Sequence, residues 1–355
     1  MLTTALILAA TLTPMPDQAA QVALTGPFCI GCGYGGLADF LLNVALFLPL
    51  GAALGAAGYR ARTATLVGVA LATTVELLQF SVIPGRDATI GDVVANTVGA
   101  GLGWMLVGQL AVFLRPPPKA AALLAAGWAL VALAGTVGAM ALFEPSLPDG
   151  PWYGQWAAGG PEPEWFEGEV RSARLGGRLL PHGLIADWQS RRQETRASGE
   201  VRLEAEIVAG KPPQKPLRIV AVATGDGRLA TLTQNRRDLH WNIRLRASDF
   251  GLRSPPLVLR GGMPGSAGDV IAVGASYGDR RAFIQVRQGE RALETRTRLR
   301  WTDGWRLLLG TAQAGRPMEV VLTGLWLLGL LGPLLGWTWL AIDGRWSRRP
   351  GARVP

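Results

Sequence analysis

Five stretches of about 20 mostly apolar residues constrain the fold of this chain more than any other feature. They are Ala38–Ala57, Ala64–Val82, Ile90–Leu114, Ala120–Phe143 and Met318–Ile342. Each is long enough to cross the hydrocarbon core of a bilayer as an α-helix. Only 17% of the residues are charged, and the mean hydropathy is positive, which is unusual for a soluble domain. The sequence therefore predicts a polytopic membrane protein with five or six transmembrane helices.

The count of five or six depends on the first apolar run, Met1–Leu12, which is too short to span a bilayer. It is either a signal peptide that lacks the usual basic start or a first helix that begins further upstream. We favour the helix and leave the signal peptide open.

Basic residues alternate between the loops that connect the apolar stretches. One side holds Arg60, Arg62, Arg115, Lys119, Arg345, Arg348, Arg349 and Arg353. The short loops on the other side contain only Arg86. Because basic loops stay in the cytoplasm, we expect residues 144–317 to be extracytoplasmic and the C-terminus to be cytoplasmic. The membrane we expect is the bacterial cytoplasmic (inner) membrane.

The composition changes after residue 143. A stretch rich in Pro, Gly and Trp, residues 144–167, resembles a linker, and short runs with β character follow it. The runs are Val201–Val208, Leu217–Thr224, His240–Arg246, Pro256–Leu259, Val270–Ala275, Ala282–Arg287 and Trp305–Leu309. Apolar and charged residues alternate in the first run, and turn signals such as Gly278-Asp279 separate the others. An antiparallel all-β sandwich is predicted.

The expected division of the chain follows from these boundaries. It comprises a hydrophobic segment with an outer loop (1–37), a helical bundle (38–143), the linker (144–167), the sandwich (168–316), a closing transmembrane helix (317–342) and a basic cytoplasmic tail (343–355).

Polar residues inside three apolar stretches carry the main functional signal. Their spacing of three or four residues places each pair on one helix face. The pairs are Asp39 with Asn43, Glu76 with Gln79, and Asp92 with Asn96. The expected topology brings all three pairs within about 10 Å of the outer surface. Ionisable groups at such depth usually face the bundle interior or a wet cavity.

The same residues resemble the VanZ-like membrane family over residues 28–115. The resemblance lies in Asp39, in Asn43 with the following Val-Ala-Leu-Phe-Leu-Pro-Leu-Gly, in Glu76-Leu-Leu-Gln79, and in Gly85-Arg86 followed by Asp92-Val-Val-Ala-Asn96. The family is named for a protein linked to teicoplanin resistance. The resemblance implies a small helical membrane domain, a cell-envelope role and no settled biochemical activity.

The β-rich segment resembles the concanavalin A-like/laminin-G superfamily through looser motifs. These are Leu217-Arg-Ile-Val-Ala-Val, Leu232-Thr-Gln, Trp241-Asn-Ile-Arg-Leu-Arg and Phe283-Ile-Gln-Val-Arg. The resemblance implies a jelly-roll sandwich that binds glycans or proteins. It can include calcium, but no compact Asp/Asn cluster supports a metal here, and we predict neither a metal nor a cofactor.

Three functions remain open for the polar residues. The leading hypothesis is a binding site for a phospholipid or lipid-linked glycan headgroup, formed by Asp39, Asn43, Gln79, Arg86 and Asn96 with the carboxylates, while the sandwich recognises a polysaccharide or a protein. Arg86 suits a phosphate because a guanidinium can bind it with two hydrogen bonds. In the second, Glu76 or Asp92 is a general base for hydrolysis or transfer of the headgroup. In the third, the network only holds the helices together, and the protein is an anchor or sensor.

Two further features remain open to more than one interpretation. Cys29 and Cys32 form a CxxC in the first outer loop, which predicts a structural disulfide, free thiols or a redox pair. Most of the +9 net charge lies in residues 146–316. Arg makes up nearly all of it, so codon bias explains it as well as binding does, and we expect no nucleic-acid partner.

Overall fold

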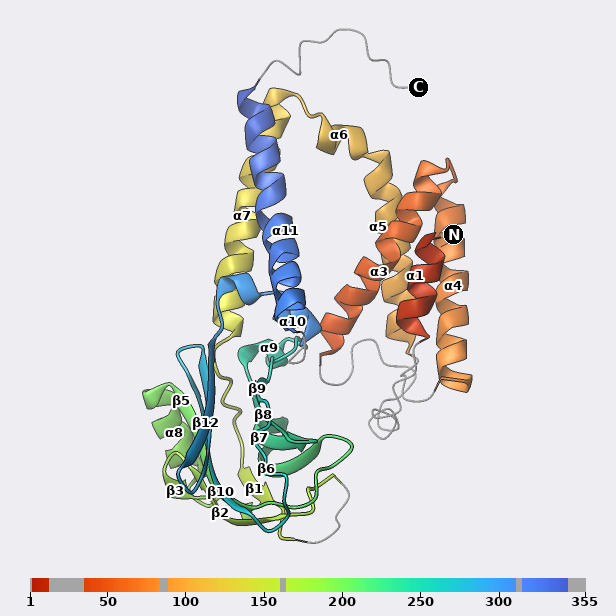
Figure 1. Ribbon diagram of the computed structural model, residues 1–355. Coiled ribbons are helices and arrows are strands. Elements are labelled where there is room, and N and C mark those ends of the chain that lie inside the picture. The colour runs from red at the N-terminus through yellow and green to blue at the C-terminus, as the bar shows by residue number, and fades with distance from the viewer. Residues whose placement is uncertain (1, 13–34, 84–88, 160–163, 311–314, 344–355) are drawn as a thin grey trace. The chain divides into compact units, whose positions relative to one another are not determined.

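The computed structural model describes residues 2–12, 35–83, 89–159, 164–310 and 315–343 and divides the chain into two compact units (Figure 1). The first unit contains residues 1–135 and 324–355, and the second contains residues 136–323. Each unit is described by itself.

Apolar helices make up the first unit. They are α1 (Leu2–Thr11), α3 (Gly36–Ala56), α4 (Ala61–Ser81), α5 (Ile90–Gly108), α6 (Leu110–Leu114), α7 (Pro118–Leu142) and α11 (Arg316–Ile342). Residues 136–142 of α7 and 316–323 of α11 belong to the second unit. Among the described residues, five helices are long and apolar enough to cross a membrane, namely α3, α4, α5, α7 and α11. The five predicted spans are thereby confirmed, although the stretch Ile90–Leu114 is broken at Gln109 into α5 and α6.

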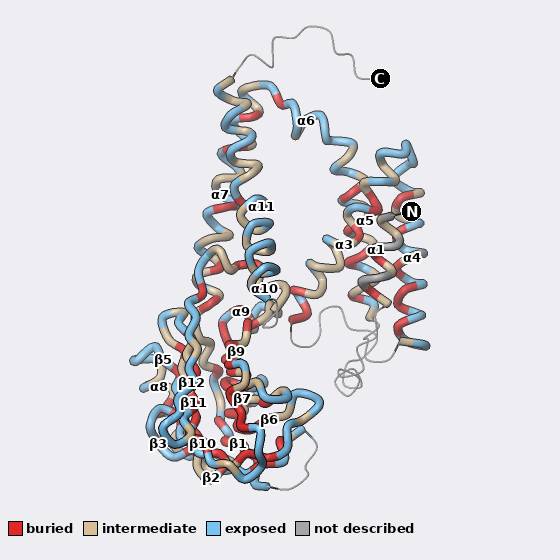
Figure 2. The backbone as a smooth tube through the Cα atoms, in the orientation of Figure 1, coloured by how far each residue is buried: buried red, intermediate tan, exposed pale blue. Residues whose placement is uncertain are grey.

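Small residues let α3 and α5 approach closely. A Cβ added at Gly99 would lie 2.3 Å from the carbonyl oxygen of Val44, and one added at Gly103 would lie 2.0 Å from that of Leu48. Membrane helices often have such small residues where they cross, because the two backbones can then approach closely and form more van der Waals contacts. Phe47 is buried beside this contact, whereas the outward faces of the helices expose many Leu and Val side chains (Figure 2). The first apolar run packs here too, as the helix α1.

Two antiparallel six-stranded sheets form most of the second unit. The first has the order β4-β1-β6-β7-β8-β9, with bounds Gly183–Leu184, Trp152–Trp156, Leu217–Thr224, Gly227–Asn235, Asp238–Ile243 and Leu257–Leu259. The second has the order β12-β11-β10-β5-β2-β3, with bounds Arg291–Arg298, Arg281–Gln288, Val270–Gly278, Glu200–Val208, Glu169–Leu175 and Arg178–Leu179. Their buried apolar side chains form one continuous core, which confirms the predicted two-sheet region (Figure 2).

The turn signals between strands are also confirmed. The β10–β11 hairpin closes through Asp279 and Arg280, which both have positive φ, at 47° and 58°. This is the geometry of a type I′ turn, whose twist matches that of the flanking strands. The β6–β7 hairpin closes through Gly225 and Asp226.

Two expectations for the second unit are wrong. The stretch predicted as a linker contains β1, because Trp152 is fully buried in the sheet core. Trp305–Leu309 is not a strand, since α10 (Arg306–Leu309) forms there. Two short helices, α8 (Trp188–Ser198) and α9 (Arg246–Asp249), lie between strands of the two-sheet region. The α8 helix is mostly charged, and it is anchored by Arg191, whose guanidinium bonds Asp187 and the Leu179 carbonyl.

Candidate functional site

Side chains of the neighbouring helices α3 and α4 form hydrogen bonds at the start of α5. The side-chain amide of Asn43, on α3, donates a hydrogen bond to the Asp92 carboxylate. The same carboxylate accepts a bond of 2.8 Å from the Thr89 hydroxyl, and the Asp92 N–H donates back to Thr89 Oγ1 at 3.2 Å. Thr89 therefore caps α5 and orients the carboxylate toward α3.

Glu76 reaches the same place from α4. One of its carboxylate oxygens accepts a bond of 3.1 Å from the backbone N–H of Thr89. The residue is only 9% exposed. Two carboxylates thus lie on either side of Thr89, one bonded to its N–H and the other to its hydroxyl. We call Asn43, Glu76, Thr89, Asp92 and Asn96 the polar cluster.

Asn96 is the most buried member of the polar cluster. It lies one turn after Asp92 in α5 and is 1% exposed. Within the described part of the chain, its side-chain oxygen Oδ1 has no hydrogen-bond partner. A buried carbonyl without a donor costs about 1–3 kcal/mol, so this oxygen is available to a donor from outside the described residues.

The other predicted site residues have different positions. Gln79 lies one turn after Glu76, but its amide donates to the Thr11 carbonyl at 2.8 Å and so ties α4 to α1. Asp39 is half-buried one turn before Asn43 on α3. Arg86, Cys29 and Cys32 lie outside the described residues.

Two contributors were missed by sequence reasoning. Thr89 precedes the apolar stretch and is not itself charged, yet the spacing Thr89-Ile-Gly-Asp92 is that of a capping box, which could have identified it. Thr11 contributes a backbone carbonyl rather than its side chain, and no sequence signal marks such a group.

The polar cluster is rich in hydrogen-bond acceptors. Two carboxylates and the Asn96 carbonyl suit a ligand that carries hydroxyl or ammonium donors. Either carboxylate is also of the type that serves as a general acid or base on such a group. No group of three or more potential metal ligands occurs among the residues that the structure describes.

A second candidate site is a groove of about 780 Å³ on the outer face of the second sheet. Its floor is the central strand β10, where the outward residues Ala272, Gly274 and Ser276 are small. Long side chains flank this floor in register on the two neighbouring strands. They are Arg202, Glu204 and Glu206 on β5, and Phe283, Gln285 and Arg287 on β11.

The groove combines the chemical groups that bind sugars. Carboxylate and guanidinium side chains form hydrogen bonds with hydroxyl groups, and an aromatic ring packs on the apolar face of a pyranose. A Cβ added at Gly274 would meet nothing within 4 Å, so the floor of the groove is open. Its volume lies within the range of small-molecule sites.

Comparison with known proteins identifies the helical part of the chain. Residues 3–113 match the sequence model of the family described as VanZ/LLP1. This match covers α1 through most of α6 and includes every residue of the polar cluster. No curated protein and no solved structure matches the chain. The likeness of the β unit to the concanavalin A-like/laminin-G superfamily therefore stays a prediction.

Proposed function

Since residues 3–113 are a VanZ-like membrane region, we propose that this protein binds the headgroup of a membrane lipid at the polar cluster. The ligand class is a phospholipid or a lipid-linked glycan of the bacterial cell envelope. The β unit, which the positive-inside pattern places on the extracytoplasmic side, recognises a polysaccharide or a protein partner.

The side-chain oxygen Oδ1 of Asn96, which has no hydrogen-bond partner among the described residues, carries this proposal. A network that only joined helices would be expected to pair all of its buried polar groups, because an unmade hydrogen bond is costly there. Here one acceptor is left over, one helical turn after Asp92 in α5. A headgroup that brings hydroxyl or ammonium donors would complete the network, and Arg86 is proposed from the sequence to hold its phosphate.

An enzymatic role is the second candidate. Glu76 and Asp92 contact the same residue, Thr89, from α4 and α5. One carboxylate could take a proton from an attacking water or hydroxyl while the other orients the headgroup. The third candidate, a non-catalytic anchor or sensor for the β unit, requires the polar cluster to act only between helices.

The groove on β10 favours a glycan over a protein as the partner of the β unit. Its flanks hold carboxylate, guanidinium and amide side chains rather than a large apolar surface. A neutral glycan rich in hydroxyl groups could accept hydrogen bonds from the guanidiniums and donate hydrogen bonds to the carboxylates. Filling the floor with Gly274→Trp should abolish binding of a neutral linear oligosaccharide such as chitohexaose, with Gly101→Ala as a control in the other unit.

The lipid proposal is tested by purifying the full chain with its native lipids and analysing them by mass spectrometry. We expect one phosphorylated lipid to be enriched with the wild-type protein and lost from Arg86→Ala. Arg60→Ala, in a loop of the opposite side, should keep it. Equal lipid profiles from equally folded proteins would contradict the phosphate role of Arg86.

A further inference from the structure

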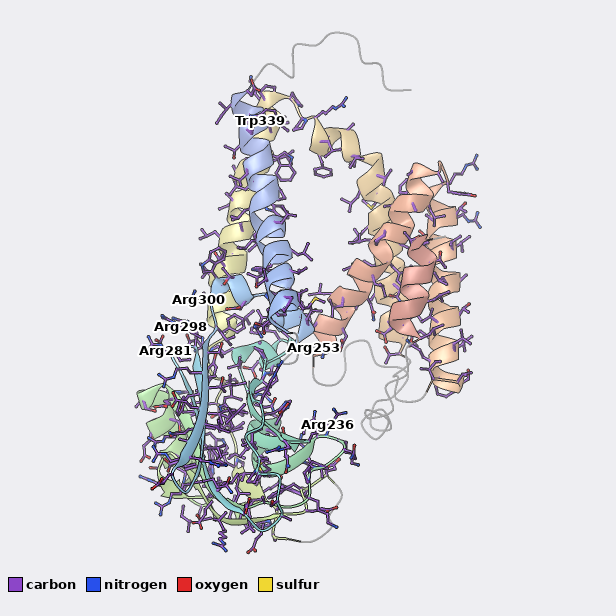
Figure 3. The ribbon with its side chains drawn as sticks, in the orientation of Figure 1. Arg236, Arg253, Arg281, Arg298, Arg300 and Trp339 are labelled. Atoms are coloured by element: carbon purple, nitrogen blue, oxygen red, sulfur yellow. The ribbon has the colours of Figure 1, made fainter. Side chains whose placement is uncertain are left out.

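Basic side chains gather at the end of the β unit that contains the last turns of α7 and the first turns of α11. Figure 3 shows Arg281, Arg298 and Arg300 close together at this end. Arg281 and Arg298 lie directly opposite each other on β11 and β12, and Arg300 follows two residues later. We call these three residues the arginine edge.

Hydrogen bonds tie this end of the unit to the last turn of α7. The Tyr277 hydroxyl, at the end of β10, donates to the Phe143 carbonyl at 2.6 Å. Arg280, in the β10–β11 turn, bonds the Glu144 carboxylate at 2.7 Å. Phe143 and Glu144 directly follow Leu142, where the apolar span ends. The turn that begins β11 is therefore held next to the end of α7, a helix long and apolar enough to cross a membrane.

The segment after β12 is tied to the other span in the same way. The indole N–H of Trp305 donates to the Thr323 hydroxyl at 3.1 Å, and Arg306 pairs with Glu319 at 2.9 Å. Both partners lie in the first turns of α11. Trp305 and Arg306 thus lie next to the start of α11, the second candidate membrane span of this pair.

The arginine edge carries more positive charge than its neighbours balance. Asp279 is within reach of three guanidiniums, at 3.3 Å from Arg280, 3.7 Å from Arg281 and 3.9 Å from Arg298. Because Arg280 is also paired with Glu144, the one Asp279 carboxylate is left to balance Arg281 and Arg298. Like charges directly opposite each other also destabilise a strand pair. The Arg281 and Arg298 side chains are 65% and 48% exposed, so external anions can reach them.

Exposed aromatic side chains lie at the same end. Trp301 follows Arg300 directly and is 37% exposed. Phe250 is 63% exposed and follows α9, whose first residue Arg246 donates its N–H to the Glu144 carbonyl. Aromatic side chains concentrate at the level of lipid headgroups, where apolar and polar surroundings meet.

We infer that the arginine edge binds anionic phospholipid headgroups of the membrane that α7 and α11 span. The position of the arginine edge favours this ligand, because the ends of α7 and α11 hold the edge at the level of the headgroups. It is set by chemistry too, because exposed guanidiniums next to aromatic rings complement phosphates above acyl chains. Such contacts orient the β unit on the bilayer, in addition to the lipid binding proposed for the polar cluster.

Hydrogen exchange of the full chain in lipid nanodiscs tests this inference. One disc contains phosphatidylcholine alone and the other adds phosphatidylglycerol. We expect amides of residues 277–281 and 296–301 to exchange more slowly in the anionic disc, by about fivefold for each arginine engaged. The double variant Arg281→Gln/Arg298→Gln should lose the difference, and high salt should remove it in the wild type.

The double variant Arg236→Gln/Arg291→Gln is the matched control. It removes the same charge from two exposed positions that belong neither to the arginine edge nor to the groove on β10. It should keep the dependence on anionic lipid. The inference is overturned if exchange in the wild type is independent of lipid charge, or if both double variants behave alike. Neither outcome bears on the polar cluster, which belongs to the other unit.

Discussion

Asn43 and Asp92 are joined by a hydrogen bond between α3 and α5, from the amide of one to the carboxylate of the other. They are 49 residues apart in the sequence. Because Asp92 also bonds the cap residue Thr89, which in turn bonds Glu76, this one contact links α3 to both other helices of the cluster. The proposed binding site is therefore built from side chains on three different helices.

A double-mutant cycle should detect this contact. Asn43→Ala, Asp92→Ala and the double variant are expected to show a coupling energy of about 1 kcal/mol, the size found for polar contacts between membrane helices. Denaturant unfolding of the full chain in mixed micelles measures it. Additive effects of the two single changes would show that the residues do not interact.

Glycines at the α3–α5 crossing should be intolerant of any side chain. Gly103→Ala places a methyl group 2.0 Å from the Leu48 carbonyl oxygen, so the helices must separate, at a cost of about 1–3 kcal/mol. Gly101→Ala is the matched control on the same helix, since its Cβ would meet nothing within 4 Å. The two variants are compared by thermal unfolding. If both unfold at the wild-type temperature, the close crossing is absent.

Tyr277→Phe should destabilise the β unit. The change leaves the Phe143 carbonyl without its 2.6 Å donor in a buried place, which costs about 1–3 kcal/mol. Tyr153→Phe, at an exposed position on β1, should leave the unfolding temperature unchanged. Burial also raises the pKa of Tyr277 above its ordinary value.

The β unit should lose stability in mild acid because of His240. Burial lowers the pKa of this imidazole below its ordinary value of 6.5, against an opposing effect of Asp238. The unfolded chain therefore takes up the proton first, so stability is full above pH 6.5 and is lost as the pH falls from there toward the folded pKa. Unfolding measured against pH should be flatter over this window in His240→Leu. NMR can report the pKa directly, since the chain has two His.

The sequence predicted the helical part of the fold well because spanning a bilayer imposes a length and a composition that are visible locally. It also predicted Asn43, Glu76, Asp92 and Asn96, because charged and amide groups stand out in apolar stretches. It did not reveal that Gln79 bonds the Thr11 backbone rather than the polar cluster, since that depends on where α1 packs.

The β unit was harder to predict because tertiary burial decides its elements. Trp152 begins a strand in a Pro- and Gly-rich stretch because its ring is buried in the core of the sheets. The apolar run Trp305–Leu309 has strand composition, but it forms one turn of helix that ends at Gly310 with φ 57°. Neither outcome is encoded in local pattern alone.

The central claim is that the polar cluster holds a lipid headgroup, and near-isosteric substitutions test it most directly. Glu76→Gln and Asp92→Asn keep the size of each side chain and an acceptor oxygen while removing the charge. Bound lipid is measured by native mass spectrometry, and thermal unfolding is measured on the same samples. The account predicts that both variants lose the lipid at a nearly unchanged unfolding temperature. Retention of the lipid together with a lower unfolding temperature would contradict it and assign the carboxylates to helix packing alone.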